Sequence, residues 1–418
     1  MNAPHLTGSA LATAHSTIAT ADLDLQGVSG APTVLFLDQS GELGGAEFAL
    51  LPLAAACKAR CAVVLLADGP FRTRLEATGV PVSVLADAQV STIRREALGL
   101  GTLRAIPGIL RQIRAVAREA RRYDVIFLNT QKALVFGALS RPLHRRPVVW
   151  FLHDIMTRAH FGRAQLLIVK WLARYGVDRI VANSQASAET LSALAGIPLA
   201  SIPVIPNGID AAAFDALDLP HADDRAALRR RFGLPEDAWL AGLFGRLAHW
   251  KGQHVALDAL VRLPDVHLVL VGSPLFGEDA YAASLRKQAE TLGVMDRVHF
   301  AGFQDDIPAW MKAMDVIVHT SIDPEPLGRV VIEGLLAGRP VIAAAAGGVL
   351  EIIRHRENGL LVQPGDTDGL VDAIEALRRA PDFAAHLAAQ GTLDAKREFS
   401  LDGYITRMTE TIARAARR

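Results

Sequence analysis

The chain has 418 residues, of which 50% are hydrophobic and 21% are charged, and its formal net charge at pH 7 is zero. This length exceeds what one hydrophobic core usually serves, so two domains are expected, and the composition excludes a largely disordered protein. The charge is unevenly spread, with 21 Lys and Arg against 14 Asp and Glu in residues 1–200 and 23 against 30 in residues 201–418. Either an anionic partner of the first half or an ordinary solvated surface accounts for this.

Targeting and metal signals are weak. Residues 1–30 lack a basic start followed by an apolar core, so we expect a flexible tail rather than a secretory signal. No apolar run is long enough to span a bilayer. Cys57 and Cys61 are expected as buried small residues of one helical stretch in a reducing compartment, since two ligands alone do not complete a tetrahedral zinc site. These features predict a cytoplasmic protein.

From Thr33 onward, short apolar runs alternate with stretches of helical periodicity such as 103–122 and 163–175. Strands separated by helices indicate a parallel sheet covered on both faces. The strands expected in this first half are 33–38, 62–68, 80–86, 124–129, 147–154 and 178–184, and a short strand and turn follow at 201–210.

After a polar, acidic stretch the alternation restarts, with strands expected at 239–247, 266–273, 297–303, 315–321, 339–345 and 359–365. We therefore expect an α/β protein with two Rossmann-like, doubly wound domains that face each other across a cleft. The expected boundaries are a tail at 1–30, a first domain at 31–210, a linker at 211–237 and a second domain at 238–399. The last helix, within 400–418, has the length to complete the first domain.

The most informative stretch is SIDPEPLGRVVIEGLLAGRPVIAAAAGGVLEII (321–353). Glu325 falls in a loop after an expected strand, and Pro326 suits the start of the following helix. The amides of Gly328 and Arg329 would point outward from that helix N-terminus, where they suit a phosphate. Glu333 lies about two turns along the helix among apolar neighbours and needs hydrogen-bond partners, for which ribose hydroxyls are suitable. A loop acid and a salt-bridge acid are the plainer interpretations of these two residues.

GRLAHWKG (245–252) follows the first strand of the second domain. It brings two cations, Arg246 and Lys251, to the same strand end. A leaving diphosphate gains negative charge as a sugar bond breaks, and two cations with a helix N-terminus would stabilise it without a metal. An exposed loop with an ordinary Arg and Lys is the alternative.

Two weaker signals lie in the first domain. Gly44 and Gly45, in SGELGGAE (40–47), would let the backbone approach a ligand closely, although the segment does not fit a dinucleotide fingerprint. His153 ends the fifth expected strand, and a single histidine there is structural as readily as catalytic.

Taken together and in this order, these motifs resemble the retaining glycosyltransferases of family 4, which have the GT-B architecture. The resemblance covers nearly everything from Thr33 onward. It rests on GGAE, HD after the fifth strand, PNGID, GRLxxxKG, and two glutamates eight apart followed by AGRPVIA and GG.

The resemblance implies roles for individual residues. Arg246 and Lys251 would bind the donor diphosphate, Glu333 the ribose, and Glu325 the transferred sugar. The backbone amides around Leu327, Gly328 and Arg329 would lie near the sugar and the phosphate, and Phe303 and Gln304 would lie near the base. Gly44 and Gly45 would let the first domain close over the diphosphate, and His153 would lie near the reacting face of the donor sugar.

The resemblance also implies the reaction. The donor would be a UDP- or GDP-linked sugar, and the acceptor a saccharide or lipid-linked molecule of bacterial-type cell-surface polysaccharide or glycolipid synthesis. Front-face displacement, in which the leaving phosphate helps take the acceptor proton, is favoured in the family, while double displacement through Glu325 stays open. No metal is expected, because the D-x-D pair Asp22 and Asp24 lies in the tail. No cofactor and no nucleic-acid partner are expected either.

Residues 94–122 combine eight arginines with apolar residues at helical spacing. Such a helix could lie on an anionic membrane surface, or it could be a sheet-covering helix with a solvated face.

Three other functions are compatible with the two-domain pattern. A sugar-nucleotide 2-epimerase shares the architecture but would need acid and base groups over the sugar ring. A non-catalytic GT-B binding protein should have lost one of the four charged site residues, and none is missing. A dinucleotide-dependent oxidoreductase lacks its glycine-rich fingerprint in both domains.

Overall fold

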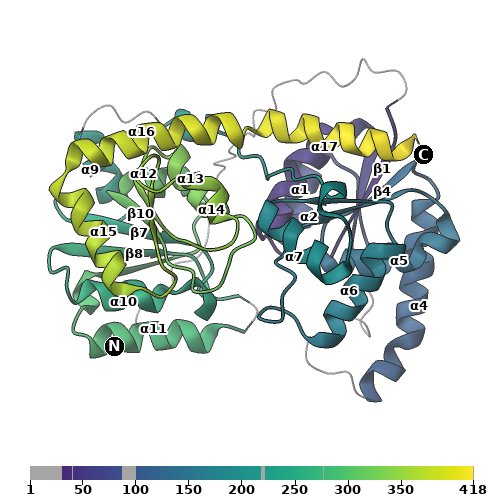
Figure 1. The fold of residues 1–418 in the computed structure, drawn as a ribbon, viewed down its shortest axis with the longest axis horizontal. Coiled ribbons are helices and arrows are strands. Elements are labelled where there is room, and N and C mark those ends of the chain that lie inside the picture. Colours follow the sequence, from purple (N-terminus) through teal and green to yellow (C-terminus); the bar gives the residue numbers. More distant parts are fainter. Residues whose placement is uncertain (1–30, 40, 87–99, 218–221, 276, 418) are drawn as a thin grey trace, which may run out of the picture.

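The computed structural model describes residues 31–39, 41–86, 100–217, 222–275 and 277–417. The predicted tail with Asp22 and Asp24, and the arginines at 94 and 95, lie outside the described residues. In the described chain two parallel sheets of six strands are each covered by helices on both faces (Figure 1). This confirms the predicted α/β class with two Rossmann-like domains.

The first sheet has the strand order β3-β2-β1-β4-β5-β6. Every residue of β1, β2, β4 and β5 is buried, as expected for strands covered on both faces. The strands are β1 Val34–Asp38, β2 Cys61–Leu65, β3 Val82–Val84, β4 Val125–Leu128, β5 Val148–Leu152 and β6 Arg179–Ala182. The helices between them are α1 Gly45–Ala56, α2 Pro70–Ala77, α4 Leu100–Ala120, α5 Gln131–His144, α6 Arg163–Tyr175 and α7 Gln185–Ala195.

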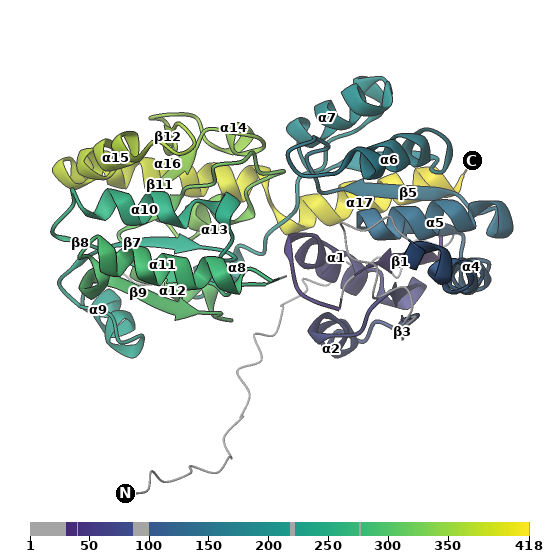
Figure 2. The same cartoon turned by 90° about the horizontal axis from the view of Figure 1, so that it is seen from below.

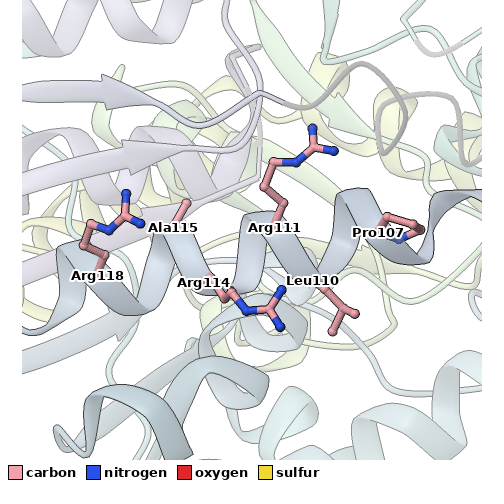
Figure 3. A pocket seen from close by; sticks show the side chains of 6 residues that line it. All are labelled: Pro107, Leu110, Arg111, Arg114, Ala115 and Arg118. Atoms are coloured by element: carbon pink, nitrogen blue, oxygen red, sulfur yellow. The ribbon is translucent and has the colours of Figure 1, made fainter.

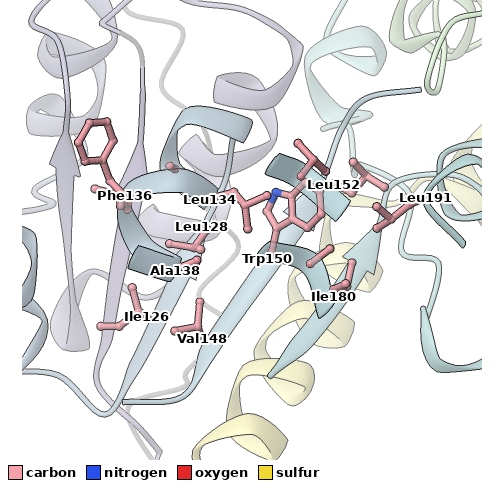
Figure 4. Packing of buried hydrophobic residues seen from close by; sticks show 14 of the residues in the cluster. Ile126, Leu128, Leu134, Phe136, Ala138, Val148, Trp150, Leu152, Ile180 and Leu191 are labelled. Carbon is pink, nitrogen blue, oxygen red and sulfur yellow. The ribbon is translucent and has the colours of Figure 1, made fainter. Parts of the chain in front are cut away.

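The core of this domain packs one face of the sheet against α4 to α7. Trp150 on β5 is 1% exposed and lies among aliphatic side chains of the neighbouring strands and helices (Figure 4). Cys57 caps α1 and Cys61 begins β2, so the prediction that both lie in one helical stretch is wrong. The apolar run from Cys61 forms a strand because it lies beside β1 in the sheet.

The second sheet has the order β12-β11-β10-β7-β8-β9. Its strands are β7 Trp239–Phe244, β8 Val266–Val271, β9 Val298–Gly302, β10 Val316–His319, β11 Val341–Ala344 and β12 Leu360–Val362. Its helices are α10 Gln253–Leu260, α11 Asp279–Thr291, α12 Ile307–Ala313, α13 Arg329–Leu336, α14 Val349–Ile352, α15 Thr367–Arg379 and α16 Pro381–Glu398. In both domains the strand order reverses direction beside the first strand, which places ligand sites at the carboxyl ends of the strands.

The segment between the domains is more ordered than a linker. Residues 201–210 form two isolated bridges, at Val204 and at Ile209, rather than the expected strand. The described part of 211–237 contains α8 Ala212–Asp215 and α9 Ala222–Arg231, which pack against α12. Phe214 and Leu228 are buried in the second core, so this stretch belongs with the second domain in packing.

The helix that follows the second domain packs on the first domain. After α16 crosses the second domain, α17 (Leu401–Ala416) runs back over the first domain (Figure 1). Tyr404 is fully buried there, and its hydroxyl donates to the carbonyl of Ala49 on α1 at 3.0 Å. The first domain is thus built from two separate parts of the sequence.

Candidate active site

An ion pair joins the carboxyl ends of two neighbouring strands in the second domain. Lys251 lies in the turn after β7, and Glu325 lies in the loop after β10, which pairs with β7 in the sheet. The Lys251 Nζ donates to Oε1 of Glu325 at 2.5 Å, and the two side chains are 15% and 8% exposed. The sequence placed both residues at strand ends, and the sheet order brings them together.

Two further side chains hold the same carboxylate oxygen. Oε1 of Glu325 lies 2.7 Å from the Nε2 of His319 and accepts from the hydroxyl of Ser321 at 2.5 Å. Burial alone would raise the pKa of Glu325, but the charge of Lys251 and the contacts with His319 outweigh it and hold the pKa well below its usual range. Glu325 is therefore a carboxylate at every physiological pH.

The loop after Glu325 is shaped by glycine. Gly328 has φ 91° and is the N-cap residue of α13, so the helix begins at Arg329 rather than near Pro326 as predicted. The carbonyl of Glu325 accepts from the amide of Gly348, which ties the loop to the strand-helix turn after β11. The first amides of α13 accordingly begin close to the Glu325 loop, with the side chain of Leu327 buried beneath it.

Glu333 has a protein partner. Its Oε1 accepts from the Nε of Arg329 at 2.7 Å, one turn earlier on α13. The guanidinium of Arg329 also lies 5.3 Å from the ring centroid of Phe48 on α1. Arg329 therefore contacts the first domain while it pairs with Glu333.

Three further residues predicted for the donor site follow strands of the second sheet at its carboxyl edge. Arg246 follows β7, and its guanidinium carbon lies 5.8 Å from the ring centroid of Trp250. Phe303 follows β9 with 59% of its surface exposed, and Gln304 beside it donates to the carbonyl of Ala301 at 2.7 Å. An exposed aromatic ring at a strand end can stack on a base.

A hydrogen-bonded chain of three side chains crosses the first sheet at its carboxyl edge. Asn129, after β4, donates from Nδ2 to Asp38 at 2.6 Å and to the carbonyl of Ala46 at 3.0 Å. Its Oδ1 must then accept from the Nε2 of His153, which is 3.1 Å away. This arrangement fixes the His153 tautomer with the proton on Nε2, and burial lowers the pKa of His153 to about 3.

A buried acid for which the motifs implied no role lies shortly after Gly44 and Gly45. Glu47, on the first turn of α1, accepts from the amide of Gly44 at 3.0 Å. Burial, then the charge of Asp38, raise the pKa of Glu47 to about 8. A Cβ placed on Gly45 would meet no atom within 4 Å, so the backbone there is open to an approaching group.

Contacts between the domains bring the two strand edges toward each other. The carboxylate of Glu351, on α14, accepts from the amides of Gln185 and Ala186 at 2.8 and 2.9 Å. These are the first two residues of α7 in the other domain (Figure 2). Arg74 and Asp305 form a second bridge at 2.7 Å. Residues after β1, β2 and β6 of the first sheet thus oppose residues after β10, β9 and β11 of the second, respectively.

Several residues of this site were missed from the sequence although a signal was present. Asp38, Asn129, His319 and Ser321 are polar residues that end or follow otherwise apolar strands. A polar side chain at the carboxyl end of a buried parallel strand lies where ligands bind in such folds. Their positions relative to one another required the strand order.

The described residues contain no group of three or more His, Cys, Asp or Glu that could hold a metal ion. Within the same residues, no helix has both the length and the apolar content needed to cross a bilayer.

Comparison with known families decides the classification. The model named Glycosyltransferase Family 4 matches residues 43–213, and the model named Glycosyl transferases group 1 matches residues 224–394. The chain belongs to glycosyltransferase family 4. It is a GT-B glycosyltransferase, as the motifs predicted.

Individual family 4 relatives support this. Over 320 residues the chain is 31% identical to the D-inositol 3-phosphate glycosyltransferase of Mycolicibacterium paratuberculosis, which covers 74% of this chain and 70% of that one. Over 163 residues it is 39% identical to the lipopolysaccharide core biosynthesis glycosyltransferase LpsE of Rhizobium meliloti, covering 39% and 46%. The match thus spans about half the length of LpsE.

Among solved structures, the fold is similar to that of Alr3699/HepE from Anabaena in complex with UDP-glucose. The TM-score is 0.83 with 38% sequence identity, and the match covers 92% of this chain and 100% of that one. A second structure of the same protein contains UDP and glucose.

Proposed function

We propose that this protein transfers a glycosyl group, with retention of anomeric configuration, from a nucleoside diphosphate sugar to a saccharide or lipid-linked acceptor. The observation that carries the proposal is the cluster around Glu325. A permanently ionised carboxylate, two cations and a helix N-terminus converge at one strand edge. This arrangement suits a sugar joined to a diphosphate.

The cations would stabilise the leaving group. When the bond between the anomeric carbon and the phosphate oxygen breaks, the diphosphate gains charge, and Arg246, Lys251 and the first amides of α13 would bind it there. Lys251 gives one hydrogen bond to Glu325 and keeps further N–H groups for phosphate. We propose that these groups do the work a metal ion does elsewhere, so that transfer proceeds without metal or other cofactor.

The titration of the site residues favours front-face displacement. A general base works best with a pKa near the operating pH, whereas Glu325 lies far below it and His153 is at about 3. Oε1 of Glu325 already accepts three contacts, which weakens it as a nucleophile. In the proposed step the acceptor oxygen bonds to the anomeric carbon, and its proton passes to the departing phosphate oxygen. Glu325 and His153 would orient the sugar.

For the donor we propose a UDP-sugar over a GDP-sugar, because the 38% identical Anabaena protein binds UDP-glucose. The base would stack near Phe303 and Gln304, and Glu333 would bind the ribose. Gly44 and Gly45 would give the first domain room to approach the diphosphate, with Leu327 and Gly328 backing the sugar.

The proposed setting is bacterial-type cell-surface polysaccharide or glycolipid synthesis on the cytoplasmic side of a membrane, by analogy with LpsE. Its proposed partner is an anionic membrane surface, through the basic helix α4. Figure 3 shows Arg111 and Arg118 projecting to one side of α4 and Arg114 and Leu110 to the other. A hollow of about 500 Å³ lies between them.

A thermal-shift screen with UDP, GDP, ADP and their common sugar conjugates in the presence of a chelator tests the donor site. A ligand at a hundred times its dissociation constant should stabilise the fold by about 2.7 kcal/mol. We expect UDP to raise the melting temperature of the wild type and of Lys287→Ala, an exposed lysine on α11, but not of Lys251→Ala. No shift with any nucleotide in the wild type would contradict the proposed donor site.

Product analysis separates the competing functions. Transfer releases free nucleoside diphosphate and leaves the anomeric configuration unchanged in the product, which NMR measures. A 2-epimerase would leave the nucleotide attached to the sugar, and a non-catalytic binding protein would give a nucleotide shift without turnover. The intact set of Arg246, Lys251, Glu325 and Glu333 favours catalysis over the last of these.

A further inference from the structure

The helix α6 has two apolar faces, only one of which is covered. Its inner face buries Leu166, Val169 and Ala173 against the first sheet. Its outer face exposes Leu167, Trp171 and Tyr175, which are 56%, 56% and 60% accessible, with Ile168 beside them. Residues four apart lie above one another on a helix, so these side chains form one continuous stripe. A surface helix usually presents polar residues on that side.

Exposed apolar residues are also frequent on the neighbouring helices. The helices α4, α5 and α6 pack side by side (Figure 1). Of the fourteen large hydrophobic residues exposed in the described part of the chain, eight lie on these three helices: Ile106, Leu110, Leu139, Leu143, Leu167, Ile168, Trp171 and Tyr175. Exposed apolar residues concentrated in this way indicate an interaction surface rather than random scatter.

Charge identifies the kind of partner. Neither α5 nor α6 contains an acidic residue, and their cations are Lys132, Arg141, Arg163, Lys170 and Arg174. Two copies of this chain that met through the same face would bring like charges together. Anionic lipid headgroups would instead neutralise the cations, while Trp and Tyr suit the boundary between headgroups and acyl chains.

A cavity at the end of the stripe adds an independent observation. It has a volume of about 620 Å³ and is lined by Tyr175 together with Arg174, Arg179 and Arg414. The Nε of Arg179 is buried and has no hydrogen-bond partner among the described residues. The one acid among its charged lining residues, Asp178, is already held by Arg141 and by the amide of Val148. Guanidinium groups gathered around such a space suit a phosphate.

We propose that α6 is the main membrane-contacting element of this enzyme, with its apolar stripe at the level of the lipid headgroups and an anionic headgroup phosphate in the cavity of Arg174 and Arg179. This deepens the contact proposed for α4, and it rests on the proposed function because a lipid-linked acceptor requires the enzyme at a bilayer. Trp171 anchors the stripe, and the exposed residues of α5 and α4 extend it.

Cosedimentation with vesicles tests the stripe. The wild type should bind vesicles of phosphatidylcholine mixed with phosphatidylglycerol, and Leu167→Glu with Trp171→Glu should weaken binding at least about tenfold. The matched control is Leu393→Glu on α16, which is 63% exposed in the other domain and should bind as the wild type does. Melting temperatures verify that each variant is folded. Unchanged binding by the double variant overturns the proposal, as does equal loss in the control.

Two further measurements sharpen the test. Trp150 and Trp310 are buried, and Trp239 and Trp250 are half-buried in the second domain, so Trp171 is the tryptophan expected to meet the bilayer. Its emission should shift to shorter wavelength on vesicle binding, and the shift should disappear in Trp171→Phe. Arg179→Gln should reduce binding to phosphatidylglycerol vesicles without changing the weak binding to phosphatidylcholine alone, and equal binding to both by wild type and variant overturns the headgroup site. Concentration-dependent dimerisation without vesicle binding would assign the stripe to self-association instead.

The vesicle and nucleotide experiments distinguish a failure of this inference from a failure of the proposed function. UDP-induced stabilisation in solution needs no bilayer, so a normal UDP shift without vesicle binding overturns only this inference. Vesicle binding without any nucleotide shift overturns only the donor site.

Discussion

The ammonium of Lys251 and the carboxylate of Glu325 lie 2.5 Å apart at the edge of the second sheet. Lys251 is proposed to bind the donor diphosphate and Glu325 the transferred sugar, so two residues with different proposed ligands hold each other in position. The pair keeps both charges compensated when no donor is bound. A diphosphate and a sugar that arrive together would find a preformed positive and negative position, which reduces the cost of organising the site.

Replacing Glu325 by Gln removes one charge of this pair with little change in size. Turnover should fall by at least about a hundredfold, and the free energy of unfolding should fall by about 3 kcal/mol because Lys251 loses its counter-ion. UDP release and urea unfolding measure these two effects. Glu290→Gln, at an exposed position on α11, is the control and should resemble the wild type.

The same variant should show a specific pH dependence. Because the folded-state pKa of Glu325 is depressed, its stabilisation is fully present above the ordinary carboxyl value of about 4.5 and is lost as the pH falls through the lower folded value. The difference in unfolding free energy between wild type and Glu325→Gln should therefore shrink below about pH 4.5. A difference independent of pH would contradict the charge assignment.

The ionisation of Glu47 should affect the pH dependence of stability in the opposite direction. Burial and the charge of Asp38 raise its pKa to about 8, so the folded protein binds a proton that the unfolded chain releases near pH 4.5. Stability contributed by the protonated acid should therefore decrease as the pH rises from about 4.5 to about 8, by up to roughly 4–5 kcal/mol. In Glu47→Gln this decline should be absent, as chemical unfolding at several pH values would reveal. A wild-type pH profile in that variant would exclude Glu47 as its origin.

Asn129 should act by positioning His153. In Asn129→Ala the imidazole loses the acceptor that fixes its tautomer, so kcat should fall while UDP binding, for which the proposed contacts lie mainly in the second domain, stays near that of the wild type. ¹⁵N NMR should show the His153 proton on Nε2 in the wild type and a mixture of tautomers in the variant. Gln131→Ala, next to the same helix start, is the control; an unaltered tautomer in Asn129→Ala would refute the role.

Glu351 should control how the domains approach each other. Its carboxylate holds two amides at the N-terminus of α7, where the helix dipole also favours an anion, and such an interaction is worth up to about 2 kcal/mol. Glu351→Ala should raise the donor KM and increase the radius of gyration measured by small-angle scattering. Glu357→Ala removes an exposed acid that pairs only within the second domain and should change neither.

The strands could be predicted because each is a continuous apolar run, and burial on both faces leaves no other location for such a run. Each of the twelve regular strands in the described part of the chain lies within a predicted range, apart from the earlier start of β2 at Cys61. The sequence singles out the two acids and two cations of the second domain because their spacing fits a strand end and a helix N-terminus.

The partners of these residues could not be predicted. Glu325 meets Lys251 because β10 pairs with β7, and the strand order of a sheet is not written in any local pattern. For the same reason, Asn129 gave no sign that it connects Asp38 with His153. The stretch 211–237 resembled a linker because its charge hides the few apolar residues, such as Phe214, that attach it to the second core.

Because α17 packs on the first domain, that domain is completed only by residues that follow the second domain in the sequence. During synthesis, the sheet that begins at Val34 emerges early but lacks Tyr404 and its neighbours, which cover one face of its core, until the second domain has been translated. The second domain, contiguous in sequence, can finish first. A chain cut short before Leu401 would therefore leave the first domain incomplete, with that face of its core exposed, while the second domain could still fold.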